Sequence, residues 1–202
     1  MRRTTFPLAL AAVAAFAAAC SQDATNPVAE LNPAEAEFLA LSVDRTSDAA
    51  AGDAFSVGSL AGPAGLTGSG TWTFSFESTR ECPAGGEVTV EGSGEFTRDA
   101  ETATAEMSFE AEKTITDCAF VRDDVTFTLN GEALLEAHWV RVERQLTEAE
   151  RHLTGFLSVV TSDGRSRECS FELHAVFDPE SGQMVVTGEV CGRTIDGTWA
   201  RG

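Results

Sequence analysis

Three histidines and five cysteines carry the most distinctive side-chain chemistry in this chain of 202 residues. His138, His152 and His174 could act as general bases or as metal ligands, because imidazole serves both purposes near neutral pH. The histidines fall on three different predicted elements, and no GxSxG, HExxH or Ser/His/Asp pattern surrounds them. We therefore interpret them as solvated or structural histidines, and we predict no catalytic residue, no metal site and no cofactor.

Paired carboxylates give no better case for an enzyme. Asp123 and Asp124 are adjacent in sequence. On a strand they would point to opposite faces, which is poor geometry for acid and base catalysis on one substrate. We expect a protein that is not an enzyme.

Four of the cysteines predict two disulfides. Their even number fits an exported protein, although three pairings are formally possible, and the absence of a CxxC pair disfavours zinc. Cys169 and Cys191 lie symmetrically about a turn at residues 178–182, and Cys82 and Cys118 bracket a predicted hairpin. We predict that Cys169 pairs with Cys191 and Cys82 with Cys118.

The fifth cysteine, Cys20, directly follows an apolar segment. Two arginines precede an unbroken apolar run over residues 8–19, which is typical of a secretory signal and too short to span a membrane. The stretch Ala17–Cys20 resembles the bacterial lipobox, in which the cysteine becomes the lipidated first residue of the mature chain. That resemblance implies a lipid anchor on Cys20, and Ser21 implies sorting to the outer membrane. Ordinary secretion with a free cysteine is the alternative.

The chain divides into four predicted segments. Residues 1–19 are a lipoprotein signal peptide, and residues 20–31 are the acylated cysteine with a flexible polar tether. Residues 32–70 hold a helix and a loop rich in glycine and alanine, and residues 71–202 form an antiparallel β domain. The expected location is the bacterial cell envelope, at the outer membrane facing the periplasm.

The net charge of the chain limits the classes of molecule that it is expected to bind. The formal net charge is −18, which repels nucleic acid and anionic lipid head groups. We expect contact with the membrane through the lipid anchor alone and no nucleic-acid partner. Solubility explains an acidic surface, and attraction of divalent cations or a cationic ligand is the more specific alternative.

One helix and a series of strands are predicted. Asn32 can cap a helix with Pro33 in its first turn, and we expect this helix over about 33–43. From Thr71 onward, large apolar residues alternate with polar ones, which indicates antiparallel strands with one buried face. Hairpin turns are predicted at Asn130-Gly131, at 162–165 and at 178–182. The expected fold is all-β, a meander of about nine strands forming a barrel or a sandwich.

Residues 132–153 fit two structures. Apolar residues recur there with spacings of four and three, as in an amphipathic helix. The turn signal at Asn130-Gly131 argues instead for strands that pair back on the preceding segment. We predict two strands with a turn near 147–149.

Several segments together are similar to uncharacterised exported bacterial β-rich lipoproteins. They are Glu81–Val90, Thr116–Cys118, Leu129–Gly131, Ser166–Cys169 and Thr187–Arg193. The resemblance implies β structure and disulfides and carries no activity. We expect a membrane-anchored lipoprotein that serves as a binding or structural interaction module. The alternative is a carrier of a small hydrophobic ligand inside a barrel, and a hydrolase is the least favoured.

Overall fold

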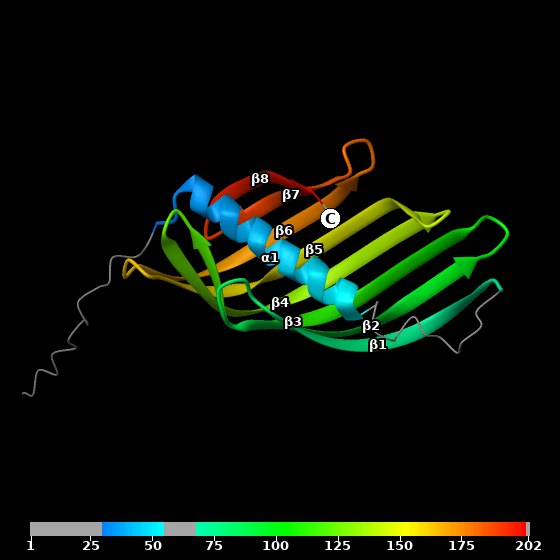
Figure 1. Cartoon of the computed structure of the whole chain (residues 1–202), viewed down its shortest axis with the longest axis horizontal. Helices are drawn as coiled ribbons and strands as arrows, with labels where there is room; N and C mark the ends of the chain where they lie inside the picture. Colours follow the sequence, from blue (N-terminus) through cyan, green and yellow to red (C-terminus); the bar gives the residue numbers. More distant parts are fainter. Residues whose placement is uncertain (1–29, 55–67, 201–202) are drawn as a thin grey trace, which may run out of the picture.

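The computed structural model describes residues 30–54 and 68–200, which form one curved sheet with one helix across it (Figure 1). Helix α1 spans Pro33–Ala54. The predicted signal peptide, Cys20 and most of the tether lie outside the described residues. Within the described ranges, no helix is both long enough and apolar enough to cross a membrane.

Eight strands follow the helix and pair in chain order as an antiparallel meander. They are β1 (Gly70–Glu81), β2 (Glu87–Asp99), β3 (Thr104–Arg122), β4 (Val125–Val142), β5 (Gln145–Thr161), β6 (Ser166–Asp178), β7 (Gln183–Val190) and β8 (Arg193–Ala200). The predicted antiparallel meander is confirmed, with eight strands in place of nine.

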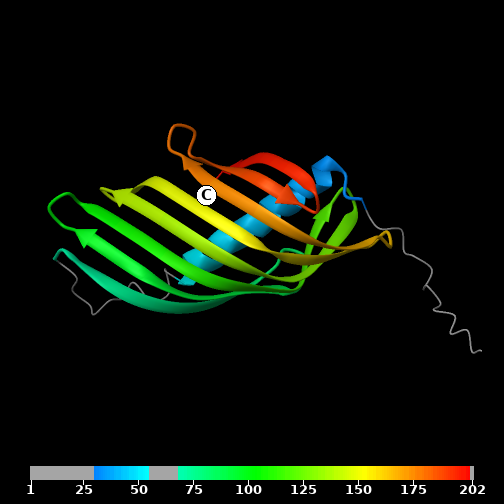
Figure 2. The same ribbon diagram turned by 180° about the vertical axis from the view of Figure 1, so that it is seen from behind.

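The sheet is strongly curved but open, so the predicted barrel or sandwich is wrong. Strands β1 and β8 are its two edges, and in the described structure they pair only with β2 and β7. Helix α1 runs diagonally along the concave face and contacts both edge strands; the view from behind shows the sheet wrapping around it (Figure 2). The helix thus buries the apolar side of the sheet, which a barrel would have buried by closing on itself.

The start of α1 is where the sequence places it, but the helix runs further than 43. Asn32 Oδ1 accepts a hydrogen bond from the Glu35 amide at 2.9 Å, and Glu35 Oε2 accepts one from the Asn32 amide at 2.9 Å. This reciprocal pair is a capping box. The helix continues to Ala54 because Val43 and Ser47 lie buried against the sheet. Asp44 and Ser47, two polar residues after 43, therefore belong to a packed face.

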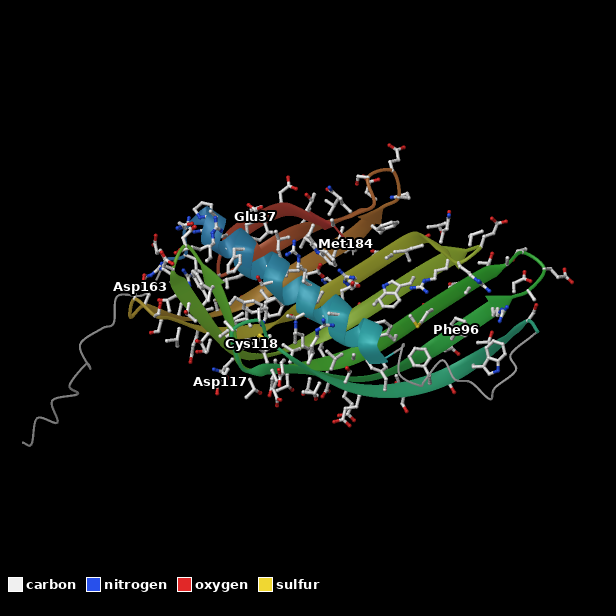
Figure 3. All side chains as sticks on the ribbon, viewed as in Figure 1. Glu37, Phe96, Asp117, Cys118, Asp163 and Met184 are labelled. Atoms are coloured by element: carbon white, nitrogen blue, oxygen red, sulfur yellow. A yellow bond between two sulfur atoms is a disulfide. The ribbon has the colours of Figure 1, made fainter. Side chains whose placement is uncertain are left out.

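The core lies between α1 and the concave face. Leu39 and Val43 of the helix meet inward side chains such as Leu129 and Leu153, all of them buried. Side chains of the sheet fill the space on either side of the helix (Figure 3). Gly197 on β8 permits the close approach, since a Cβ there would lie 3.2 Å from Glu37 of α1.

An aromatic group extends the core beyond α1. Phe109 packs edge-on against Phe76 and Trp139, with ring centroids 5.3 and 5.7 Å apart. Trp72 stacks on Phe96 at 6.0 Å, in the part of the sheet that Figure 3 shows beyond the end of the helix. Strands β1 to β4 therefore share one layer of aromatic side chains on the concave face.

The predicted turn at Asn130-Gly131 is wrong, because both residues lie inside β4. The hairpin between β3 and β4 instead turns at Asp123 and Asp124, both with positive φ, so these acids are a turn pair and not strand residues. The Asn130 side chain accepts a hydrogen bond from the Asp117 amide at 2.8 Å and fixes the bulge there. Gly131 is required by close strand approach, since a Cβ would lie 2.1 Å from the Phe156 carbonyl oxygen.

Residues 132–153 form strands, as predicted, but the turn lies earlier than 147–149. The turn residues are Glu143 and Arg144, and Val142 pairs with Gln145. A bulge in β5 at Thr147, where Val140 pairs with Glu148 but Arg141 pairs with Leu146, brings Leu146 and Ala149 onto the same face. That bulge explains the spacing of three between Leu146 and Ala149, whereas Trp139 and Val142 lie on opposite faces of β4.

The remaining predicted turns are confirmed at 162–165 and 178–182. Between β6 and β7, Phe171 pairs with Val190 and Phe177 with Met184. The next turn, at Cys191 and Gly192, has positive φ at both residues.

Candidate functional site

The convex face, formed by the strand side chains that point away from α1, is strongly acidic. Alternation along each strand and the pairing register bring these residues onto the same side of the sheet. The acidic residues of this face are Glu77, Glu81, Glu87, Glu91, Glu95, Asp99, Glu106, Glu110, Glu112, Glu132, Glu136, Glu148, Glu150, Glu168, Glu172, Glu189 and Asp196.

Basic side chains are segregated from the convex face. Along the eight described strands, each lysine or arginine occupies a concave-face position: Arg80, Arg98, Lys113, Arg122, Arg141, Arg151, Arg167 and Arg193. The sign of charge therefore changes across the thickness of one sheet. A surface of this kind produces a negative field that attracts cationic groups.

A groove of about 680 Å³ lies on the convex face over β3 to β7. Its apolar side chains are Leu134 and Phe156, which are 59% and 73% exposed. Phe156 is opposite Glu132, and in the next pair on the same face Leu134 is opposite Thr154. The two apolar side chains are therefore diagonal neighbours on β4 and β5. A large phenyl ring left this exposed is unusual and marks a candidate contact surface.

Carboxylates surround that groove. Glu112, Glu132, Glu172 and Glu189 line it from β3, β4, β6 and β7, together with threonine and serine. Lys113 also belongs to the lining, but its side chain is buried on the other side of the sheet. We call Leu134, Phe156 and these four glutamates the acidic groove.

The three histidines converge on the convex face. They stand on β4, β5 and β6, and His152 is directly opposite His174. His174 Nε2 lies 2.6 Å from a Glu150 oxygen, and His152 Nε2 lies 3.2 Å from a Glu172 oxygen. His138 is the third member. Within the described residues, no three His, Cys, Asp or Glu side chains are arranged to hold a metal ion.

A buried polar network joins α1 to the concave face. Arg151 donates to both carboxylate oxygens of Asp44, at 2.7 to 3.1 Å, and contacts Asp48 at 2.5 Å. Trp199 Nε1 donates to Asp44 Oδ2 at 2.7 Å. Asp44 and Arg151 are fully buried. These contacts connect the middle of the helix to β5 and β8.

Lys113 forms the other half of this network. Its ammonium donates to the Val43 carbonyl at 2.7 Å, to Ser47 Oγ at 2.7 Å and to Thr46 Oγ1 at 3.2 Å. Both hydroxyls use their own hydrogens on helix carbonyls, so three acceptors meet the three donors of a charged lysine. Burial lowers the pKa of Lys113 to about 7. Reasoning from sequence missed this network, although a lysine in the inward track between Ala111 and Ile115 was a signal for it.

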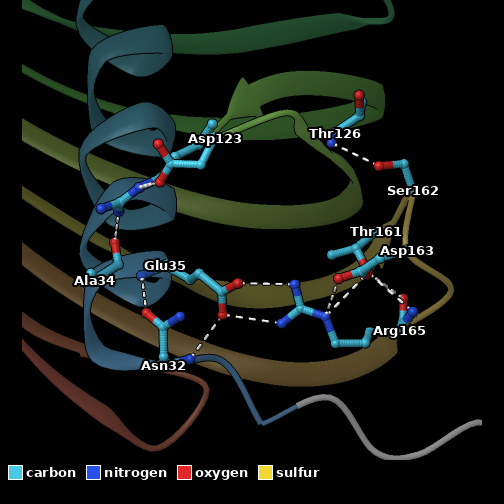
Figure 4. A network of polar contacts seen from close by, with 10 residues as sticks. Asn32, Ala34, Glu35, Asp123, Thr126, Thr161, Ser162, Asp163 and Arg165 are labelled. Carbon is cyan, nitrogen blue, oxygen red and sulfur yellow. Dashed lines mark hydrogen bonds and ion pairs between the residues drawn. The ribbon is translucent and has the colours of Figure 1, made fainter.

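A second polar cluster holds the start of α1 (Figure 4). Arg165 donates to both oxygens of Glu35, at 3.1 and 2.9 Å, and to Asp163 at 2.9 and 3.0 Å. The hydrogen bond from Arg165 lowers the pKa of Glu35, and the Arg165 and Thr161 hydrogen bonds lower that of Asp163 to about 2. Arg122 donates to the Ala34 carbonyl from the next hairpin. The turn residues are thus positioning groups for the helix.

Both predicted disulfides are present. Cys82 bonds to Cys118, with Cα atoms 5.4 Å apart, and Cys169 bonds to Cys191, at 4.9 Å. Both lie at the same end of the strands, one near the β1–β2 turn at one edge of the sheet and the other beside the β7–β8 turn at the opposite edge. The remaining predicted site residue, Cys20, lies outside the described residues.

No protein-family model matches the chain, and no curated protein or solved structure matches it either. The β structure and the disulfides that the sequence resemblance implied are present.

Proposed function

We propose that this protein is a lipid-anchored lipoprotein of the bacterial envelope, held at the outer membrane by Cys20, that acts as a non-enzymatic interaction module through its convex face. The observation that carries the proposal is the contrast between the two faces of the sheet. The concave face is occupied by the chain's own helix, through the apolar core and the network around Asp44 and Arg151. The convex face carries the acidic groove.

A binding role also fits the chemistry of the groove. Phe156 gains from leaving water, because burying a large apolar side chain stabilises a complex by about 1.5–3 kcal/mol. The carboxylates around it supply direction and register more than affinity. A carrier inside a barrel needs a closed sheet around a cavity, and this sheet is open with a helix on its inner face.

Native mass spectrometry of the protein extracted from its own cells tests the interaction role. We expect the wild-type chain to retain a bound partner and the double variant Leu134→Ser, Phe156→Ser to lose it. Val121→Ser is the matched control, since Val121 is 56% exposed but does not line the groove. Equal retention by all three proteins would contradict the proposal.

A further inference from the structure

We infer that the acidic groove receives a cationic segment of a partner protein in which arginine or lysine residues flank at least one large apolar side chain. This inference rests on the proposed function and specifies the chemistry of the partner. The convex positions of the described strands carry carboxylates and no lysine or arginine. Only a cationic partner gains from such a field.

Charge alone does not select the groove, since carboxylates extend over the whole convex face. The selecting feature is the apolar pair Leu134 and Phe156 inside a hollow of about 680 Å³. Isolated exposed ion pairs contribute little and are screened by salt. Specific binding at this place therefore requires an apolar side chain of the partner against Phe156, with its cationic neighbours reaching the surrounding glutamates.

Geometry sets the spacing of such a segment. Glu112 pairs with Leu134 across β3 and β4, and Glu132 pairs with Phe156 across β4 and β5. Each apolar side chain thus has a carboxylate on the adjacent strand, about 5 Å away at the Cβ atoms. A partner needs its cationic residues within one or two positions of the apolar one.

Other occupants fit less well. A second copy of this chain would bring one acidic convex face against another, and like charges repel. An anionic membrane surface or nucleic acid is repelled in the same way. A neutral apolar ligand would leave the four carboxylates of the rim unused.

Fluorescence anisotropy with synthetic peptides tests the inference on the full chain carrying Cys20→Ser. The probe is a short labelled peptide of arginines with two central leucines. One comparison peptide replaces the leucines by serine, and the other replaces the arginines by neutral citrulline. We expect the arginine–leucine peptide to bind at least about tenfold more tightly than either comparison peptide, and to weaken steeply with added salt.

Variants locate the binding. Phe156→Ser should weaken binding of the arginine–leucine peptide about tenfold, and Val121→Ser should not change it. The pair Glu112→Gln, Glu132→Gln should weaken it more than Glu77→Gln, Glu81→Gln, which removes the same charge from β1. All of these positions are solvent-exposed, so the fold is expected to survive, and circular dichroism checks this.

Each contrary outcome is informative. Equal losses of peptide binding in the groove and control variants would show unspecific attraction and overturn the inference. Binding of the citrulline peptide as tight as that of the arginine–leucine peptide would indicate an apolar ligand and would also overturn it. If native mass spectrometry finds a partner that depends on Phe156 while the peptides fail to bind, the interaction role stands and this inference falls. If neither is seen, both fall.

Discussion

Lys113 is the only lysine in the sequence, and it is buried. It occupies an inward position of β3 where the alternating pattern otherwise places apolar residues. Its three acceptors all belong to one turn of α1, and Arg151 meets the acids of the same stretch. An apolar stripe alone fixes the rotation of a helix weakly, whereas these directional contacts define one position.

Burial of this amine predicts a dependence of stability on pH. The pKa of Lys113 is lowered from 10.5 to about 7, chiefly by desolvation. Between about pH 7 and 10.5 the unfolded chain holds a proton that the folded chain has lost. The free energy of unfolding should therefore increase with pH, by up to about 1.4 kcal/mol per unit. Urea denaturation at several pH values measures this slope.

Lys113→Met is the control for that measurement. The chain has no tyrosine and no other lysine, so few other side chains titrate in this range. The variant should lose the slope, because methionine does not titrate. A slope equal to that of the wild-type chain would show that another group is responsible.

At the scale of the elements, α1 is the component that makes an open sheet stable. It covers the concave face and is held at its start by the capping box and Arg165, and at its middle by Asp44. A single layer of sheet has no core without such a cover. The helix is therefore part of the fold itself.

Removal of one buried charge should loosen this helix. Asp44→Asn weakens the pairing of Arg151 in a buried site and should lower the free energy of unfolding by about 3–5 kcal/mol. An amine-acylating reagent gives a second measurement, because it reaches Lys113 only when α1 moves away. Labelling should be slow in the native wild-type chain and faster in the variant. Native labelling as fast as that of the urea-unfolded chain would contradict the packing of α1.

The disulfide between Cys169 and Cys191 should also stabilise the strands that it joins. It spans 22 residues. Cys191→Ser should lower the free energy of unfolding by about 2–5 kcal/mol and reduce Tm clearly, because the unfolded chain gains freedom. Calorimetry measures the change, and peptide mapping of the non-reduced wild-type protein checks the pairing. An unchanged Tm would mean that this link contributes nothing to the sheet.

At the scale of the whole molecule, the lipid anchor that we propose on Cys20 would hold the acidic convex face at the membrane. Cys20→Ser should release the protein from membranes into the periplasmic fraction or leave an unprocessed precursor. Acyl chains contribute about 0.8 kcal/mol per buried CH₂, so the effect should be all-or-none. Fractionation and immunoblotting measure it. Mature protein that still sediments with membranes would refute the lipobox interpretation.

Much of the sheet was predictable, because period-two alternation and disulfide spacing are local signals. The turn at 178–182 and the pairing of Cys169 with Cys191 follow from them. The open sheet and the full length of α1 were not, since both depend on contacts between the helix and distant strands. The acidic groove was hidden for a similar reason: Leu134 and Phe156 become neighbours only once the register of β4 and β5 is known.

The central claim is that the convex face at Phe156 is the working surface of the molecule. A photo-reactive amino acid at position 156, introduced in living cells, tests it most directly. The same residue at position 77, on the convex face of β1 and away from the groove, is the control. We predict a discrete covalent adduct from position 156 and none from position 77. No adduct from 156, or the same adducts from both positions, would contradict the claim.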